Sequence, residues 1–391
     1  MMSARRLPQP DAAAQAHSAL LTAHIIQRMH AAGGRLPFSE FMQDILYAPG
    51  LGYYSAGWRK FGAEGDFITA PELSPLFSQC VARQCAQVLA SLPADSRIIL
   101  EFGAGTGRMA VDVLRKLARM ETLPVAYWIL ELSGELQQRQ RALFAEELPE
   151  LLPRVRWLSQ LPETGFSGVI LGNEVLDAMP IERFHVTETQ LERFYVAWDG
   201  TQFIWQTAGY DEPMLSAILS PLLPQLPVGY VSEYNALLAG WFRHLSCCLD
   251  KGLVLLIDYG FPRAEFYHPQ RNEGTLMCHY RHYAHSDPLI MVGLQDVTAH
   301  VDFTAVAESA VDVGFSVAGY CDQANFLLSC GLMDLAQATP VEDTVNWTRQ
   351  TQAVKRLLLP SEMGELFKVI ALTRDWDAPL LGFRHDQQGR L

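Results

Sequence analysis

The chain has 391 residues, of which 49% are hydrophobic and 19% are charged, and its formal net charge is −13 at pH 7. This length predicts one large α/β domain with insertions, or two domains, and excludes a single small core. The acidic balance argues against a nucleic-acid partner, because nucleic-acid binding normally needs a basic surface, whereas a basic substrate is compatible with it.

The cysteines and the hydropathy pattern set further limits. The seven cysteines include no CxxC pair, which favours buried free thiols in a reducing compartment over disulfides or a zinc site. No apolar run approaches the length of a membrane span, so we expect no membrane insertion. Residues 1–11 contain two arginines but no apolar core and no amphipathic stripe, so neither a secretory signal nor a mitochondrial presequence is predicted.

The N-terminal part is predicted to be helical. Apolar and small residues at helical spacing predict a helix over residues 12–29, which Gly33 and Gly34 end. A second short helix is expected after Pro37, with Ser39 as a candidate N-cap.

A polar and aromatic loop follows. Residues 47–54 are rich in turn residues and tyrosine, and residues 65–72 end in Pro71 and Glu72, which suit the first turn of a helix continuing to Leu89. The loop is expected either to cover a ligand as a lid or to form a surface turn packed by its own aromatic rings.

The most informative stretch comes next. An apolar run over residues 98–100 ends in Glu101 and then in three glycines at alternate positions, Gly103, Gly105 and Gly107, before a predicted helix over residues 109–120. A buried strand, a tight glycine turn and a helix start form a cradle for a nucleotide-type ligand. The alternative is a plain strand-turn-helix whose glycines serve only packing.

The acid beside the glycines selects the ligand. A dinucleotide fingerprint would place its third glycine where Arg108 stands, and Glu101 would repel a pyrophosphate. S-adenosylmethionine carries an ammonium and a sulfonium and no phosphate, so it fits this stretch better than a nicotinamide dinucleotide, the cofactor of an oxidoreductase.

The second predicted strand also ends in an acid. The apolar run over residues 125–130 is followed by Glu131, which is expected to bind the ribose hydroxyls of the cofactor. Its other interpretation is the N-terminal acid of the next helix (residues 134–144), where it would be favourable to the helix dipole.

After a short third strand over residues 155–158, the fourth predicted strand leads into a polar segment. Residues 168–172 run into Asn173, Glu174 and Asp177, which are expected at the carboxyl edge of the sheet, where such folds bind ligands. Short alternating runs after Pro180 predict an antiparallel insertion.

The remaining elements are predicted in sequence order. A helix is expected over residues 232–249, a buried strand over residues 252–257, a histidine-rich loop without zinc spacing over residues 267–285, and strands over residues 315–320 and 367–372.

The polar groups indicate a chemistry. A carboxylate can bind a guanidinium bidentately, orient one nitrogen toward an activated methyl group and accept its proton. Glu174 is the first candidate for this role and Asp177 the second, although both could simply be acids at a helix N-terminus. Asp66, Glu72 and Asp296 are further candidates, for which loop or cap roles compete.

Together, these segments resemble the MidA family of S-adenosylmethionine-dependent methyltransferases, which is related to the mitochondrial complex I assembly factor that methylates an arginine. The match rests on three segments, residues 65–72, 101–107 and 173–180. It continues in order through residues 257–260, 295–303, 323–328 and 363–368.

The resemblance implies a class I methyltransferase fold, which is an α/β Rossmann-like sheet of seven strands with the last antiparallel. It also implies inserts that form a cap over the acceptor side. We expect a helical N-terminal segment with a lid-like loop over residues 1–92, a core over 93–182 and 251–375, an inserted β and helical substrate cap over 183–250, and a tail over 376–391. Because no presequence is predicted, we expect a bacterial cytoplasmic protein.

The leading hypothesis is methyl transfer from S-adenosylmethionine to an arginine of a protein, with a respiratory complex I subunit as the candidate partner. The alternatives are methylation of a small molecule at the same site and an assembly chaperone that keeps the cofactor site only for stability. Candidate catalytic residues are Glu174, Asp177 and Asp296. Cofactor contacts are expected from Thr69, Glu101, Gly103, Ala104, Gly105, Gly107, Glu131, Leu132 and Asn173.

Overall fold

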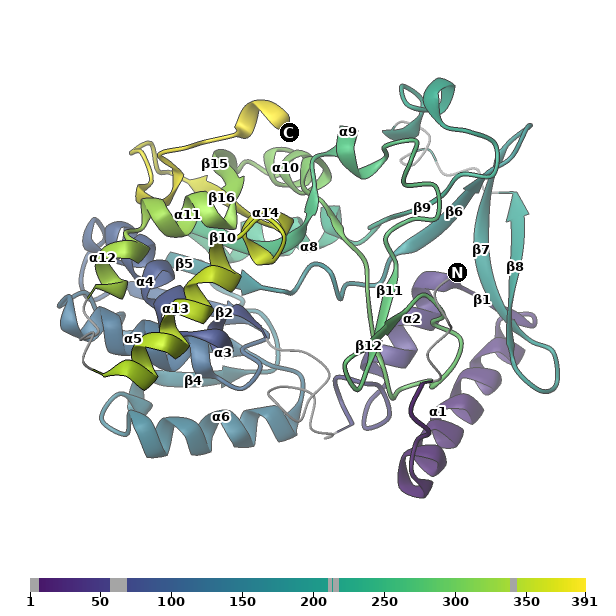
Figure 1. The fold of residues 1–391 in the computed structure, drawn as a ribbon, viewed down its shortest axis with the longest axis horizontal. Helices are drawn as coiled ribbons and strands as arrows, with labels where there is room; N and C mark the ends of the chain where they lie inside the picture. The colour runs from purple at the N-terminus through teal and green to yellow at the C-terminus, as the bar shows by residue number, and fades with distance from the viewer. Residues whose placement is uncertain (1–6, 57–68, 210–212, 214–217, 338–342) are drawn as a thin grey trace. The chain divides into compact units, whose positions relative to one another are not determined.

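The computed structural model describes residues 7–56, 69–209, 213, 218–337 and 343–391 (Figure 1). The chain forms two compact units, each assembled from three segments. Unit 1 comprises Met1–Phe67, Asp177–Leu237 and Arg263–His300, and unit 2 comprises Ile68–Leu176, Leu238–Pro262 and Val301–Leu391. The predicted lid residues at 65–68, including Asp66, lie outside the described part of the chain.

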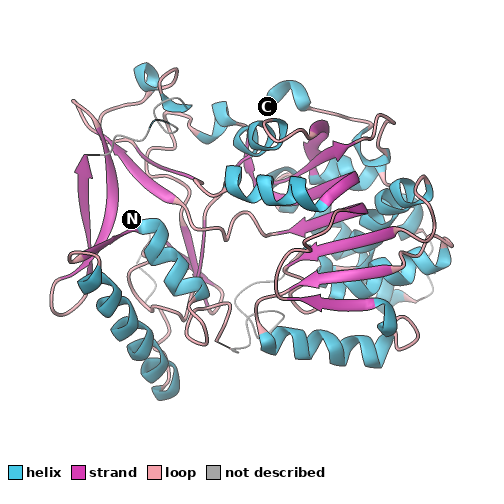
Figure 2. Ribbon diagram, turned by 180° about the vertical axis from the view of Figure 1, so that it is seen from behind, coloured by secondary structure: helices cyan, strands magenta, loops and turns pink. Residues whose placement is uncertain are grey.

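A large twisted sheet forms the centre of unit 2 (Figure 2). Its strands, in spatial order, are β15 (Ser316–Asp322), β16 (Phe367–Arg374), β10 (Leu249–Phe261), β5 (Phe166–Asn173), β2 (Arg97–Phe102), β3 (Ala126–Leu130) and β4 (Val155–Leu158), and the short β14 (Val301–Asp302) lies beside β10. β10, β5, β2, β3 and β4 are parallel, whereas β16 is antiparallel to both of its neighbours. The expected α/β, Rossmann-like sheet of seven strands with the last antiparallel is confirmed.

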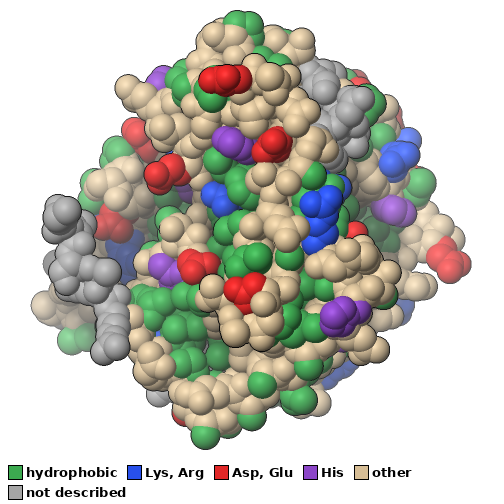
Figure 3. Space-filling view, turned by 90° about the vertical axis from the view of Figure 1, so that its right-hand side faces the viewer, with side chains coloured by type: hydrophobic (Ala, Val, Ile, Leu, Met, Phe, Trp, Pro, Cys, Tyr) green, Lys and Arg blue, Asp and Glu red, His purple; other side chains and the backbone are tan. Residues whose placement is uncertain are grey.

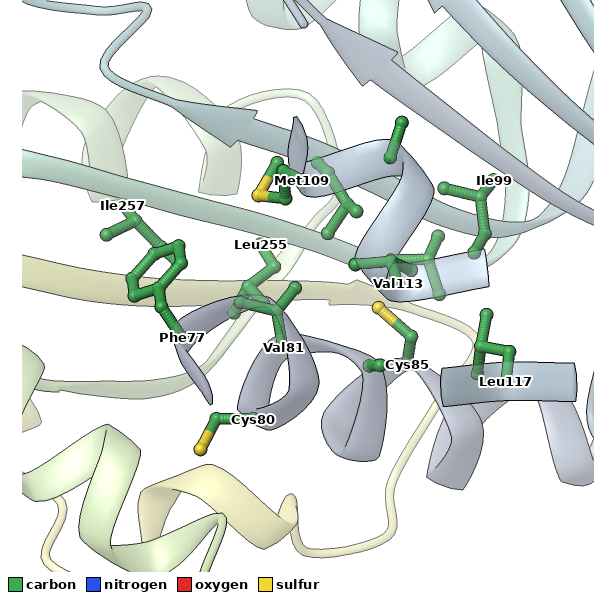
Figure 4. Close-up of a cluster of buried hydrophobic side chains, with 14 of the residues drawn as sticks. Phe77, Cys80, Val81, Cys85, Ile99, Met109, Val113, Leu117, Leu255 and Ile257 are labelled. Atoms are coloured by element: carbon green, nitrogen blue, oxygen red, sulfur yellow. The ribbon is translucent and has the colours of Figure 1, made fainter. Parts of the chain in front are cut away.

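Helices cover this sheet. They are α3 (Ala70–Leu73), α4 (Pro75–Ala90), α5 (Arg108–Arg119), α6 (Gly134–Glu147), α8 (Leu238–Cys248), α10 (Phe303–Val311), α11 (Gln323–Ser329), α12 (Leu332–Ala336), α13 (Thr344–Leu358) and α14 (Met363–Leu366), with short 3₁₀ turns η1 (Leu152–Arg154), η3 (Leu381–Phe383) and η4 (Gln388–Arg390). Figure 4 shows Phe77 and Val81 of α4 and Val113 of α5 packed against Ile99 of β2 and Leu255 of β10. This apolar packing holds α4 and α5 against the sheet, and α5 follows directly after the glycine turn.

Unit 1 is built around a smaller antiparallel sheet and two helices. The sheet has the order β1 (Arg35–Pro37), β7 (Leu191–Trp198), β6 (Glu182–Val186), β9 (Val231–Tyr234), with β8 (Phe203–Gly209) paired to β7. The other elements are α1 (Ala12–Ala31), α2 (Phe38–Tyr47), η2 (Leu223–Gln225), α9 (Arg263–Phe266), and a three-stranded sheet of β12 (Tyr283–His285), β11 (Met277–Tyr280) and β13 (Asp296–Thr298). A separate hydrophobic core joins α1 and α2 to β7 and β8.

Four sequence predictions for these elements were wrong. The helix expected from Pro71 to Leu89 is interrupted at Ser74, whose extended backbone (φ −163°, ψ 139°) and hydroxyl cap the new helix α4. The helix predicted over 232–249 begins only at Leu238, because Val231–Tyr234 pairs with β6 and buries Glu233. The histidine-rich loop contains the hairpin of β11 and β12. Ser39 does not cap α2, since its hydroxyl donates to Oε1 of Glu182 at 2.6 Å.

The division into units also differs from the expected domain boundaries. Helix α4 packs in the core of unit 2 and not with the N-terminal helices, and residues 263–300 belong to unit 1. The expected polar tail is anchored, because Phe383 is buried against Phe326 and the backbone N–H of Gln387 donates to the carbonyl of Tyr320. Distant parts of the chain therefore complete each core.

Two surface properties concern possible partners. None of the described helices combines the length and apolar character that a membrane span requires. On the side in view in Figure 3, Lys and Arg side chains are interspersed with Asp, Glu and His and are not gathered into one basic area.

Candidate active site

The glycine turn between β2 and α5 has the backbone conformation that its sequence predicts. Gly103, Gly105 and Gly107 have φ values of 57°, 53° and 87°, in the left-handed region that side chains with a Cβ rarely adopt. The N–H of Gly103 donates to the carbonyl of Leu130 at 3.0 Å, and the N–H of Gly107 donates to the carbonyl of Ala104 at 2.7 Å. The turn is therefore held against the end of the neighbouring strand β3.

Glu101 lies beside this turn as a buried carboxylate. It is 1% exposed, and its Oε2 accepts a 2.7 Å hydrogen bond from the hydroxyl of Tyr127. Burial raises the pKa of the Glu101 carboxyl from about 4.5 to about 7, the charge of Glu131 adds to the rise, and the hydrogen bond from Tyr127 opposes it. A cationic ligand group next to Glu101 would stabilise the ionised form of this side chain.

Glu131 lies directly after β3, 7% exposed. Its Oε1 accepts from the backbone N–H of Ser133 at 2.9 Å, and its Oε2 accepts from Nε2 of Gln140 at 3.3 Å. Ser133 also caps α6 through its hydroxyl, so the helix start and the carboxylate are held together. Both interpretations of Glu131 are compatible with this geometry, because the carboxylate lies at a helix N-terminus and at the carboxyl edge of the sheet.

The turn after β5 presents Asn173 and Glu174. Glu174 has φ 53°, a left-handed conformation that is unusual for a residue with a side chain. Its backbone N–H donates to the carbonyl of Ile257 at 2.9 Å, and its Oε1 accepts from Nδ2 of Asn173 at 3.1 Å. The Oδ1 atom of Asn173 is buried, and no described residue gives it a hydrogen bond.

Asp258, at the carboxyl end of β10, holds this turn. Its Oδ2 accepts from the backbone N–H groups of Val175 and Leu176 at 3.1 and 2.9 Å, and its Oδ1 accepts from the N–H of Tyr259 at 2.9 Å. Because Asp258 is 1% exposed, these hydrogen bonds are shielded from water. The strained conformation of Glu174 is therefore imposed by two neighbouring strands.

The two other candidate catalytic acids lie in unit 1. Asp177 and Asp296 are 5% and 3% exposed, and the hydroxyl of Tyr54 donates to Oδ1 of Asp296 at 2.8 Å. Burial raises the pKa of the Tyr54 hydroxyl well above its ordinary value, and the charges of Asp296, Tyr47 and Asp177 add to the rise. The structure thus brings Asp177 and Asp296 together around Tyr54, whereas Glu174 belongs to unit 2.

The remaining predicted residues are placed as follows. Thr69 stands before α3, where its backbone carbonyl accepts from Glu72 and Leu73. Ala104 is buried in the glycine turn, and Leu132 is 69% exposed directly after Glu131. Glu72 lies in the first turn of α3.

Sequence reasoning assigned no role to four residues that support the site, Tyr54, Tyr127, Gln140 and Asp258. Only Asp258 carried a signal, since it is an acid directly after a buried strand. Tyr127 and Gln140 lie inside ordinary strand and helix patterns, and Tyr54 lies in a turn 242 positions from its partner Asp296. Contacts at such separations leave no periodic trace in a sequence.

The residues present fit S-adenosylmethionine. The left-handed glycines leave room for close approach of a ligand to the backbone. The buried carboxylate of Glu101 suits an ammonium group, and Glu131 suits ribose hydroxyls.

Comparisons with known proteins agree with this fit. A family model for S-adenosyl-L-methionine-dependent methyltransferases matches residues 80–321. A protein from Burkholderia thailandensis, solved with bound S-adenosyl-homocysteine, is 43% identical over 99% of this chain and 100% of its own, with a TM-score of 0.94. S-adenosyl-homocysteine is the form of the cofactor that remains after methyl transfer.

More distant relatives are named for a more specific activity, the methylation of protein arginine. The protein arginine methyltransferase NDUFAF7 homologs of Caenorhabditis elegans and Drosophila melanogaster, both mitochondrial, are 27% and 28% identical to the chain. Each alignment covers 87% of this chain, with 83% of the C. elegans relative and 82% of the D. melanogaster relative. The matched family model, the shared fold and the residues that suit the cofactor all support the same conclusion. The chain belongs to the family of S-adenosyl-L-methionine-dependent methyltransferases, and its cofactor is S-adenosylmethionine.

Proposed function

We propose that this methyltransferase modifies an arginine side chain of a protein. Two observations support the proposal, namely the names of the mitochondrial relatives and the acidic side chains near the ends of the strands. An arginine-bearing subunit of respiratory complex I is the specific candidate that the resemblance to the MidA family suggests.

The observation that carries the proposal is the constrained carboxylate of Glu174. S-adenosylmethionine supplies a methyl group that is already activated by its sulfonium, so the protein must orient the acceptor and accept one proton. Glu174 is held at the end of β5 by the hydrogen bond from its backbone N–H to the carbonyl of Ile257 and by the Asn173 amide. A carboxylate in that position can bind a guanidinium, whose ordinary pKa above about 12 keeps it protonated, and accept a proton from it.

Asn173 adds a second acceptor to this arrangement. Its buried Oδ1 atom is available to an N–H group of a ligand, while its Nδ2 group fixes the carboxylate of Glu174. Two adjacent acceptors match the fork of N–H donors of a guanidinium better than they match a single hydroxyl. In unit 1, Asp177 and Asp296 are the further candidate acids for substrate recognition.

The test is a methylation assay on a proteome that lacks this protein. Extract from cells without the gene is incubated with the purified protein and S-adenosylmethionine carrying an isotopically labelled methyl group. We expect label in methylarginine after acid hydrolysis of the protein fraction. A second assay uses purified complex I subunits as the substrate and should give the same product. Label confined to the small-molecule fraction would instead identify a small-molecule methyltransferase.

A matched pair of variants links this activity to Glu174. Glu174→Gln should lower methylarginine formation by at least about 100-fold, which corresponds to about 3 kcal/mol of lost transition-state stabilisation. Glu121→Gln changes an exposed glutamate with nearly the same backbone conformation (φ 55°) and should leave the activity unchanged. If Glu174→Gln abolishes methylation but complex I assembly in cells is normal, a binding role is the essential one.

A further inference from the structure

A buried glutamine beside the cofactor cradle has no role in the chemistry described above. Gln140 is 0% exposed and lies in the middle of α6, on the buried face of the helix together with Leu136 and Phe144. Full burial of a primary amide is unfavourable unless its donors and acceptor are all used, so its hydrogen bonds are informative.

The two polar atoms of the Gln140 side chain form hydrogen bonds to residues of three strands or of the turns that follow them. Nε2 donates to the carbonyl of Gly105 at 2.9 Å, in the turn after β2. The same Nε2 donates to Oε2 of Glu131 at 3.3 Å, after β3. Oε1 accepts from the indole Nε1 of Trp157 at 2.7 Å, on β4.

The indole of Trp157 fixes the orientation of the amide. An indole N–H can only donate, so the atom that faces it must be the carbonyl oxygen of Gln140. The amino group is therefore directed at the glycine turn and at Glu131, and a rotated amide would lose all three hydrogen bonds.

Gln140 also packs directly against the glycine turn. A Cβ added to Gly107 would lie 3.2 Å from Cγ of Gln140 and 3.5 Å from its Cα. Together with the φ of 87° at Gly107, this contact shows that turn and helix are fitted to each other at that position.

We propose that Gln140 is the positioning residue of the cofactor site, which sets the orientation of Glu131 and the shape of the glycine turn together. The proposal rests on the expected contact of Glu131 with the cofactor ribose. One donor group serves both a carboxylate and a loop carbonyl, so loss of the amide loosens two parts of the cradle at once. The effect falls on cofactor affinity and not on the transfer step, because Gln140 lies on the side of Glu131 and not of Glu174.

The first test measures binding of S-adenosyl-homocysteine by calorimetry, since this ligand needs no acceptor. Gln140→Met keeps the length of the side chain and removes both the carbonyl oxygen and the amino group of the amide. We expect its Kd to rise roughly 10- to 100-fold, as for loss of a hydrogen bond to a charged group. Gln138→Met alters an exposed glutamine of the same helix and should leave the Kd unchanged.

A second ligand separates positioning from simple loss of fold. We compare S-adenosyl-homocysteine with its 2′-deoxyribose analogue, which lacks one of the two hydroxyls expected to contact Glu131. The wild-type protein should bind the complete ligand about tenfold more tightly. In Gln140→Met this preference should fall below about threefold, because Glu131 no longer has a fixed orientation. A generally destabilised protein would lose affinity for both ligands in equal proportion, and that result would overturn the proposal.

Two more variants complete the test. Trp157→Phe removes the donor to Oε1 of Gln140 and should weaken binding in the same direction, about threefold, without touching the cofactor itself. Glu131→Gln alone tests the expected ribose contact. If Glu131→Gln has no effect on the Kd, the expected contact of Glu131 with the cofactor ribose is wrong, and the proposal for Gln140 is overturned with it. If Glu131→Gln weakens binding but Gln140→Met matches Gln138→Met, only the role of Gln140 fails.

Discussion

Glu174 combines an unfavourable backbone conformation with a candidate catalytic side chain. A left-handed φ costs a residue with a Cβ about 1–2 kcal/mol, so the backbone conformation of Glu174 lowers the stability of the folded protein. The same residue type stands at Glu121 with φ 55°, on the surface and away from the cradle. The pair allows strain and function to be measured separately.

Substitution by glycine should therefore separate stability from activity. Glu174→Gly relieves the strain and should raise the free energy of unfolding by about 1 kcal/mol while methyl transfer is lost. Glu121→Gly should raise stability by a similar amount and keep full activity. Urea denaturation and the methylation assay measure the two effects, and a Glu174→Gly protein that is both active and more stable would contradict a catalytic role.

Glu101 predicts a dependence of stability on pH. Its pKa is raised from about 4.5 to about 7 by burial, so the folded state binds a proton more tightly than the unfolded state between these values. Stability of the cofactor-free protein must then fall as pH rises through this window. The loss of stability levels off above pH 7 at about 3.5 kcal/mol, from about 1.4 kcal/mol per pKa unit over the shift from about 4.5 to about 7.

Glu101→Gln should remove this penalty. The variant should be more stable than the wild-type protein at pH 8 and equally stable at pH 4, in denaturation experiments without cofactor. Glu150→Gln, at an exposed position, is the control and should give a curve parallel to that of the wild type. Parallel curves for Glu101→Gln as well would mean that Glu101 is not a buried, unneutralised acid. The same variant should bind S-adenosyl-homocysteine more weakly, because it lacks the carboxylate that we expect to bind the ligand ammonium.

At the level of elements, the site depends on a contact between neighbouring strands. The turn after β5 is shaped by Asp258 from β10, which accepts three backbone N–H groups. Buried donors that lose their acceptor are costly, so the turn cannot keep its shape when Asp258 is removed. The proposed catalytic role of Glu174 therefore requires β10 to be in place.

Asp258→Ala should lower the free energy of unfolding by about 3 kcal/mol or more and abolish methyl transfer. Asp258→Asn keeps one carbonyl oxygen and should lie between the alanine variant and the wild type in both measurements. Asp250→Ala, at an exposed position of the same strand, should change neither. Activity retained in a folded Asp258→Ala protein would show that the turn keeps its shape without these hydrogen bonds.

Elements whose signals are local could be predicted from the sequence. The β2, glycine-turn, α5 unit was found because an apolar strand, three glycines and a periodic helix follow each other. β9 was not found, because Val231–Tyr234 continues without a break signal into the periodicity of α8, and only pairing with β6 makes it a strand. The break at Ser74 was missed for a similar reason, since Pro71 and Pro75 both suit a helix start.

At the level of the whole molecule, the two units divide the candidate site residues. The glycines, Glu101, Glu131, Asn173 and Glu174 belong to unit 2, while Asp177 and Asp296 belong to unit 1. The sequence predicted the membership of all these residues in one site, but it could not predict the unit boundary between Leu176 and Asp177. That boundary depends on contacts between segments that are far apart in the chain.

Cofactor binding should therefore stabilise unit 2 directly. S-adenosyl-homocysteine at about 100 times its Kd should add about 2.7 kcal/mol to the stability of the folded state. In hydrogen exchange, the amides of β2, β3 and the glycine turn should show the strongest added protection. Glu101→Ala should abolish this protection. Added protection confined to β6, β7 and β8 would instead indicate that the cofactor binds to unit 1, which would contradict the prediction.

The position of β16 has a consequence for synthesis of the protein. This strand is formed by Phe367–Arg374, yet it lies between β10 and β15 and hydrogen-bonds to both. Until the ribosome has released these residues, β10 and β15 each have an open edge that can pair with another nascent chain. The sheet therefore cannot close during most of translation. Nascent chains that stop before Phe367 should aggregate or require a chaperone, however well their N-terminal half has folded.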